Sequence, residues 1–115
     1  MGIEKVGIVG AGQMGSGIAH VFALAGYEVV LQDIEELVLT RAMESIRGNL
    51  DRQVRRGRVS EADRDAALGR IRTTLDLREV GPTDLVVEAA SERETIKQAI
   101  FEDLGPHLRP HTILT

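Results

Sequence analysis

The sequence lacks cysteine and tryptophan altogether, and aromatic residues make up only 3% of its 115 positions. Without cysteine the chain forms no disulfide bond and carries no thiolate nucleophile. With so few aromatic side chains, its core must be built mainly from Val, Ile, Leu and Ala, within a hydrophobic content of 43%. A chain of this length forms one domain and buries roughly two-thirds of its unfolded surface.

Other absences narrow the class of protein. No apolar stretch approaches the ~20 residues that a membrane-spanning helix needs. The first apolar segment begins almost at once, which leaves no room for a signal peptide. The net charge of −4 gives no general attraction to nucleic acid or to an anionic membrane. We therefore expect a cytoplasmic protein that binds neither nucleic acid nor membrane.

A glycine-rich turn is the most informative feature that is present. Gly10, Gly12 and Gly15 lie between two apolar segments, residues 6–9 and 29–31, in VGIVGAGQMGSGIAHVFALAGYEVVLQD. The first segment predicts a short buried strand that ends at the glycines. The second predicts another strand, which leads to an acid, Asp33, 18 residues after Gly15.

The residues between these strands predict a helix that begins near Gln13 and ends at Gly26. Apolar residues recur there at i, i+3, i+4 and i+7 and mark one helix face: Ile18, Val21, Phe22 and Ala25. Strand, glycine turn, helix, strand and acid at this spacing form the fingerprint of a dinucleotide-binding site. The alternative is a glycine-rich turn in an α/β protein that binds no nucleotide.

Each part of the fingerprint has a physical role. Gly10 permits the tight turn, Gly12 lets the backbone approach a pyrophosphate, and Gly15 lets the helix pack closely. The unpaired N–H groups at the start of the helix would face the phosphates. The expected cofactor-binding residues of the turn are therefore Gly10, Ala11, Gly12, Gln13, Met14 and Gly15.

Asp33 predicts which dinucleotide binds. Its carboxylate would accept hydrogen bonds from both hydroxyls of the adenine ribose. A 2′-phosphate would instead meet a negative charge, with no basic residue beside it in Gln32-Asp33-Ile34. The sequence thus favours NAD over NADP.

Residues 34–70 form a long excursion before the next predicted strand, residues 71–75. A helix is expected from about Glu35 to Arg56, with an apolar stripe of Leu37, Ala42, Ile46, Leu50 and Val54. Gly57 offers a C-cap and Ser60 an N-cap for a second helix, so the two helices form a hairpin that projects from the sheet. Further predicted elements are a strand at 85–87, a helix at 93–104 and a strand that begins at Thr112.

The chain resembles the NAD-binding domain of the L-3-hydroxyacyl-CoA dehydrogenase family. The resemblance is carried by residues 10–19, 26–31 with Asp33, Asn49-Leu50-Asp51, residues 84–89, Glu92 and Lys97. It implies an α/β fold: a Rossmann-type, doubly wound, mostly parallel sheet over residues 1–115, with residues 34–70 as a protruding helical arm between the second and third strands. It also implies that the chain stops before the family's helical C-terminal domain.

The resemblance assigns further residues. Glu92 and Lys97 match the pair near the nicotinamide end of NAD, although a loop acid and a surface lysine would look the same. Asn49 and Arg56 match arm residues that contact coenzyme A. A basic cluster of Arg52, Arg55, Arg56 and Arg58 could meet CoA phosphates, or could be an ordinary charged helix surface.

The implied reaction is reversible hydride transfer between NAD and an L-3-hydroxyacyl-CoA, with 3-hydroxybutyryl-CoA as the expected substrate. The family's catalytic residues fall beyond Thr115, so no catalytic residue and no metal ligand is assigned here, and this chain alone is expected to bind NAD without catalysis. We expect a homo-oligomer. The alternatives are a related NAD-dependent dehydrogenase of a hydroxy acid or sugar acid, and a non-catalytic NAD-sensing module.

Overall fold

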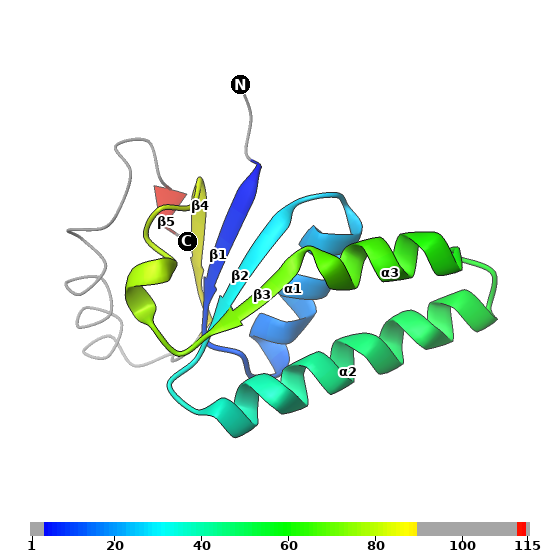
Figure 1. The fold of residues 1–115 in the computed structure, drawn as a ribbon, viewed down its shortest axis with the longest axis horizontal. Coiled ribbons are helices and arrows are strands. Elements are labelled where there is room, and N and C mark those ends of the chain that lie inside the picture. The colour runs from blue at the N-terminus through cyan, green and yellow to red at the C-terminus, as the bar shows by residue number, and fades with distance from the viewer. Residues whose placement is uncertain (1–3, 90–112, 115) are drawn as a thin grey trace.

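The chain folds around a parallel sheet with helices on its face (Figure 1). A computed structural model describes residues 4–89 and 113–114 of the protein. The strands within these residues are β1 (Lys5–Val9), β2 (Glu28–Gln32), β3 (Ile71–Thr74), β4 (Leu85–Glu88) and β5 (Ile113–Leu114). They lie in the order β3-β2-β1-β4-β5, and every neighbouring pair is parallel. This is the doubly wound order of a Rossmann-type sheet, so the predicted fold class is confirmed.

The helices follow the sequence predictions closely. α1 (Gln13–Leu24) connects β1 to β2, and α2 (Glu36–Arg55) and α3 (Glu61–Gly69) both lie between β2 and β3. Figure 1 shows α2 and α3 side by side, extending past the sheet. Their ends carry the expected signals: Gly57, just after α2, has φ 72°, and the Ser60 hydroxyl accepts the Asp63 N–H at 3.0 Å. The helix expected at 93–104 lies outside the described residues.

The larger core lies between the sheet and the three helices. Alternate residues of the central strands face it, and α2 contributes one stripe of buried side chains: Leu39, Ala42, Ile46 and Leu50. The expected start of this stripe at Leu37 was wrong, because that side chain is 58% exposed. Leu39 precedes Ala42 by three residues and therefore shares its helix face, whereas Leu37 does not.

The opposite face of the sheet carries a smaller core. Val9, Val30 and Val86 pack there around Val80, and Leu77 lies against them. Leu77 belongs to the short 3-10 helix η1 (Leu77–Glu79), which lies between β3 and β4, and Val80 directly follows this helix. The middle strands are thus buried on both sides, as a parallel sheet requires.

α1 packs on the sheet through small residues. Its buried positions are Gly15, Ser16, Ala19 and Ala23. The apolar face expected from periodicity is a different one: Val21 is 65% exposed, and Ile18 and Phe22 are only partly buried. Small buried side chains let the helix lie close to the strands, and this brings its first turn against the end of β1.

Candidate dinucleotide-binding site

The glycine turn lies where the strand order reverses. From β1 the chain proceeds to β2 and β3 on one side, while β4 and β5 lie on the other. Ligands of doubly wound sheets bind at such a switch point, outside the carboxyl ends of the strands. Gly10 directly follows β1 there and has φ 100°, a conformation that favours glycine. Its N–H donates to the Gln32 carbonyl at 2.7 Å, which ties the turn to the end of β2.

The start of α1 presents backbone N–H groups to solvent. Gly12 is the N-cap and makes no side-chain capping bond, and the first helical bond runs from the Ser16 N–H to the Gly12 carbonyl at 2.9 Å. Within the described part of the chain, the N–H groups of Gly12, Gln13 and Met14 have no acceptor. These residues are exposed, so their amides are available to an anion.

The turn also has room for that anion. A Cβ atom at Gly12 would meet no atom within 4 Å in the free protein. The fingerprint expects a pyrophosphate to approach the backbone at this glycine. Gly15, in contrast, is buried and packs against the turn backbone. Packing within the fold therefore requires a glycine at residue 15, whereas at residue 12 it does not.

Asp33 lies beside this turn, as the fingerprint requires. It follows β2, is partly buried, and donates its own N–H to the Thr74 carbonyl at 3.2 Å. One carboxylate oxygen, Oδ2, accepts the Ala11 N–H at 2.9 Å, and the other, Oδ1, accepts the Glu35 N–H at 3.0 Å. Sequence reasoning missed both bonds. The bond from Ala11 follows from the parallel register of β1 and β2. This register pairs Val9 with Gln32, so the residues that come directly after the two strands are neighbours.

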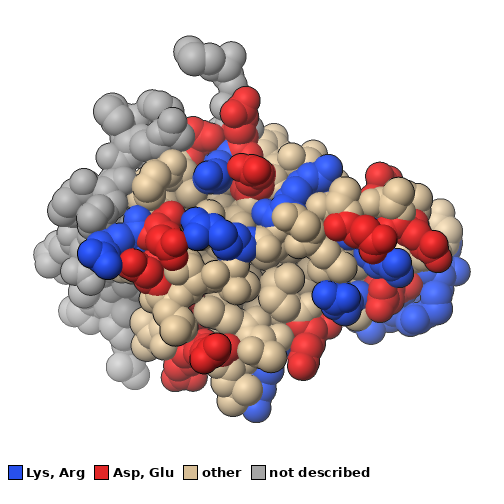
Figure 2. Space-filling model, viewed as in Figure 1, with Lys and Arg blue, Asp and Glu red and all other residues tan. Residues whose placement is uncertain are grey.

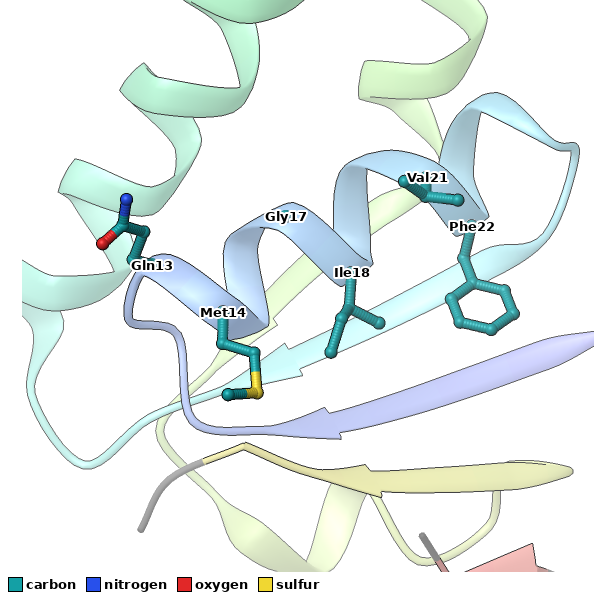
Figure 3. A pocket seen from close by; sticks show the side chains of 6 residues that line it. All are labelled: Gln13, Met14, Gly17, Ile18, Val21 and Phe22. Carbon is teal, nitrogen blue, oxygen red and sulfur yellow. The ribbon is translucent and has the colours of Figure 1, made fainter. Parts of the chain in front are cut away.

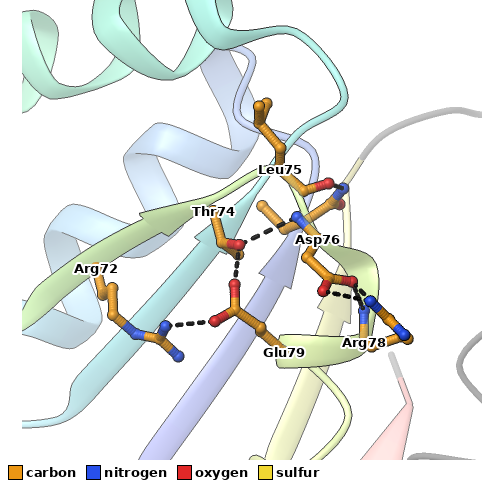
Figure 4. Close-up of polar contacts among 7 residues, drawn as sticks. Arg72, Thr74, Leu75, Asp76, Arg78 and Glu79 are labelled. Carbon is orange, nitrogen blue, oxygen red and sulfur yellow. Dashed lines mark hydrogen bonds and ion pairs between the residues drawn. The ribbon is translucent and has the colours of Figure 1, made fainter.

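A polar network fixes the end of β3 next to Asp33 (Figure 4). The Thr74 hydroxyl donates to Glu79 and accepts the Asp76 N–H at 3.0 Å, and the Arg72 guanidinium donates to Glu79 at 2.7 Å. These hydrogen bonds to Glu79 hold its pKa below its ordinary value. The bond from the Thr74 hydroxyl has the larger effect, and the bond from Arg72 has the next largest. This network holds the strand end whose carbonyl accepts the Asp33 N–H. It was not foreseen from the sequence.

A shallow apolar groove of about 390 Å³ runs along α1 from the turn (Figure 3). Its lining residues are Gln13, Met14, Gly17, Ile18, Val21 and Phe22. Met14 stands at the end nearest the glycines and is 61% exposed. The groove offers almost no polar group, and it shares Gln13 and Met14 with the exposed start of the helix.

The arm carries the residues expected to meet coenzyme A. The side-chain oxygen Oδ1 of Asn49 accepts a hydrogen bond from the Arg52 guanidinium. The Arg56 side chain is exposed and has no hydrogen-bond or ion-pair partner in the described part of the chain. Figure 2 shows basic and acidic side chains side by side at the far end of the arm. Contacts to neighbouring helices hold that end in place: Arg64 Nη1 lies 3.2 Å from Asp51 Oδ1, and His20 Nε2 lies 2.9 Å from Gln53 Oε1.

Two expected site residues, Glu92 and Lys97, lie outside the described residues. Over residues 4–89 and 113–114, no three metal-binding side chains come together. No helix in the same part of the chain has the length and apolar character to cross a membrane.

Four features together define a dinucleotide-binding domain. They are a doubly wound sheet, a glycine turn at its switch point, free amides at the start of a helix, and an acid at the end of the next strand. The family pattern described as 3-hydroxyacyl-CoA dehydrogenase, NAD binding domain, matches residues 5–115. The chain belongs to this family, and its cofactor is NAD.

Individual relatives agree with this assignment. The chain is 47% identical over 112 residues to a 3-hydroxybutyryl-CoA dehydrogenase of Bradyrhizobium diazoefficiens, covering 97% of the chain and 38% of the relative. It is 46% identical over 102 residues to one of Mycobacterium tuberculosis, covering 89% of the chain and 36% of the relative. The chain thus spans little more than a third of the length of these curated relatives.

Solved structures show the same fold. The crystal structure of 3-hydroxybutyryl-CoA dehydrogenase from Escherichia coli matches with a TM-score of 0.95 and 38% identity, over 99% of this chain and 24% of that one. The (S)-3-hydroxybutyryl-CoA dehydrogenase of Ralstonia eutropha matches with a TM-score of 0.93 and 34% identity, over 98% of this chain and 40% of that one.

Proposed function

We propose that this domain orients NAD for the reversible conversion of an L-3-hydroxyacyl-CoA to a 3-ketoacyl-CoA, with 3-hydroxybutyryl-CoA as the substrate. The observation that carries the proposal is the pairing of free amides at Gly12, Gln13 and Met14 with a carboxylate at Asp33, at one switch point. Relatives that are 47% and 46% identical over the matched residues are named 3-hydroxybutyryl-CoA dehydrogenases, which supports the choice of 3-hydroxybutyryl-CoA as the substrate.

The cofactor would lie along the carboxyl edge of the sheet. The pyrophosphate accepts hydrogen bonds from the amides at the start of α1, where the partial positive charge of the helix favours an anion. The adenine ribose donates its hydroxyls to Asp33, whose carboxylate oxygens retain lone pairs beyond the two backbone bonds that they accept. When bound, NAD supplies the hydride acceptor. Glu92 and Lys97 are proposed to contact its nicotinamide end.

A fluorescence titration of the 115-residue chain with NADH and NADPH tests the cofactor site. We expect saturable binding of NADH and at least about tenfold weaker binding of NADPH, because a 2′-phosphate would approach the Asp33 carboxylate. Equal affinity for the two cofactors would contradict the role of Asp33. Binding of neither would contradict the site itself. We expect no turnover of 3-hydroxybutyryl-CoA by these residues alone.

The arm is proposed to contact the coenzyme A portion of the substrate through Asn49 and Arg56. Exposed arginines at its far end are free to form charge-assisted hydrogen bonds with phosphates. Replacing Arg56 with Ala should weaken CoA binding, whereas Arg41→Ala removes the same charge near the opposite end of α2 and should leave it unchanged. Equal effects of the two replacements would indicate a general charge effect. An unaffected variant of Arg56 would favour a dehydrogenase of another hydroxy acid.

We propose that the protein acts in the cytoplasm as a homo-oligomer. Its apolar groove beside α1 leaves Met14 and Val21 exposed, which supports association. Light scattering over a range of protein concentrations tests the oligomer. A monomer at every concentration would contradict it.

A further inference from the structure

The Asp33 carboxylate is engaged before any cofactor binds. Its two oxygens accept the N–H groups of Ala11, at 2.9 Å, and Glu35, at 3.0 Å. Ala11 belongs to the glycine turn after β1, and Glu35 is the N-cap of α2. A single side chain therefore connects the two loops between which the adenosine half of a dinucleotide would lie.

The bond to Ala11 continues the β1–β2 ladder beyond the strands. Val9 and Gln32 are the last paired residues, and the Gly10 N–H still finds a backbone acceptor, the Gln32 carbonyl at 2.7 Å. For the next amide, that of Ala11, a side-chain carboxylate takes the place of a backbone carbonyl. Ala11 is only 2% exposed, so without Asp33 its N–H would be a nearly buried donor lacking an acceptor.

This arrangement determines which amides of the turn point outward. With the N–H groups of Gly10 and Ala11 held toward β2, those of Gly12, Gln13 and Met14 remain for an anion. We propose that Asp33 is a positioning residue for the phosphate-binding turn, in addition to being the acceptor for the ribose hydroxyls. The inference rests on the proposed cofactor site, and it predicts an effect on phosphate binding that ribose recognition alone would not produce.

The first test needs no ligand. Amide hydrogen exchange of the 115-residue wild-type chain, followed by NMR, should show Ala11 protected and the neighbouring Gly12 unprotected. In Asp33→Ala the exchange of Ala11 should rise about tenfold or more, because the variant lacks the carboxylate that accepts this N–H. The amide of Val30, in the middle of β2, should keep its protection and so report an intact fold. Exchange of wild-type Ala11 as fast as that of Gly12 would overturn the proposal even if the variant did not fold.

The second test uses ADP and its 2′,3′-dideoxy analogue, which has no ribose hydroxyls to offer. Asp33→Ala should weaken binding of both probes, the dideoxy probe by about tenfold. A residue that contacts only the ribose would leave the dideoxy affinity unchanged, or would raise it because a negative charge is removed. Either of those results would overturn the positioning role.

Glu35→Gln provides the matched control. It removes one negative charge from the same loop and retains the backbone N–H that donates to Asp33. Neither the protection of the Ala11 amide nor the affinity for dideoxy-ADP should fall in this variant, and a fall equal to that of Asp33→Ala would overturn the proposal. If the wild-type chain binds neither probe, the proposed cofactor site fails, and the exchange of Ala11 still decides the positioning role.

Discussion

The backbone of Gly15 lies so close to Gly10 that a Cβ atom at residue 15 would stand 1.8 Å from the Gly10 carbonyl oxygen and 2.9 Å from its carbonyl carbon. Both of these atoms belong to the backbone, which cannot turn aside as a flexible side chain would. The contact joins the first turn of α1 to the glycine that directly follows β1. The third glycine of the fingerprint is thus required by the fold itself, before any cofactor is present.

Gly15→Ala should therefore destabilise the domain, by about 3 kcal/mol or more, since overpacking against backbone has no cheap relief. Gly17→Ala is the matched control in the same helix, because a Cβ atom there would meet nothing within 4 Å. That variant should gain about 0.5–1 kcal/mol from improved helix propensity. Urea unfolding followed by circular dichroism measures both. Equal midpoints for Gly15→Ala and the wild type would contradict the contact.

Gly12→Ala should separate folding from binding. The residue has φ −70° and ψ −163°, which alanine adopts readily, and the space around it is open in the free protein. We expect an unchanged unfolding midpoint together with a loss of NADH affinity of at least about tenfold, because the methyl group would occupy the approach of the pyrophosphate. Wild-type affinity in this variant would mean that the cofactor takes another path.

Glu79 should make stability depend on pH. Its pKa is lower in the folded protein than its ordinary value, so the carboxylate contributes stability above its unfolded pKa and loses it as the pH falls through the folded one. Glu79→Gln should lower the unfolding midpoint at neutral pH, and the gap to the wild type should narrow in acid. Glu44→Gln, at an exposed position of α2, should leave the midpoint unchanged. A gap for Glu79→Gln that widened in acid would contradict the assigned contacts.

Gly7 in the middle of β1 also has no room for a side chain in the structure as it stands. A Cβ atom there would lie 2.5 Å from Val80 Cγ1 and 2.7 Å from Thr83 Oγ1. Gly7→Ala should be destabilising, and Val80→Ala should partly relieve it by removing the nearest atom. The double variant is then more stable than the two separate losses predict, by about 0.5–3 kcal/mol. Simple additivity in a double-mutant cycle would show that the two residues do not compete for space.

Much of this architecture could be predicted because its signals are local. Apolar runs indicated the strands, Ser60 and Gly57 marked the ends of the arm helices, and Gly10 marked the turn. The exact helix face was less certain. Leu37 has the same apolar character as Leu39, but only Leu39 shares the helix face of Ala42, and Leu37 is 58% exposed.

The relations that shape the site are not local. The bond from Ala11 to Asp33 joins residues 22 positions apart, and the crowding of Gly7 by Val80 depends on how η1 returns over the sheet. The hydrophobic periodicity of the sequence cannot indicate either of these two contacts, because the residues that form them are not part of a repeating pattern. In α1 the pattern pointed away from the fully buried positions, which are small residues, whereas Ile18 and Phe22 pack against the core only partly buried and Val21 is exposed.

The position of β1 at the centre of the sheet has a consequence for synthesis on the ribosome. Its partner on one side, β2, follows within the same βαβ unit, whereas its partner on the other side pairs Val6 with Leu85, 79 positions later (85 − 6). Between them the chain must produce the whole helical arm. A nascent chain therefore carries a central strand with one unpaired edge while α2 and α3 are being synthesised. The length of the arm sets the time between synthesis of β1 and synthesis of its partner β4.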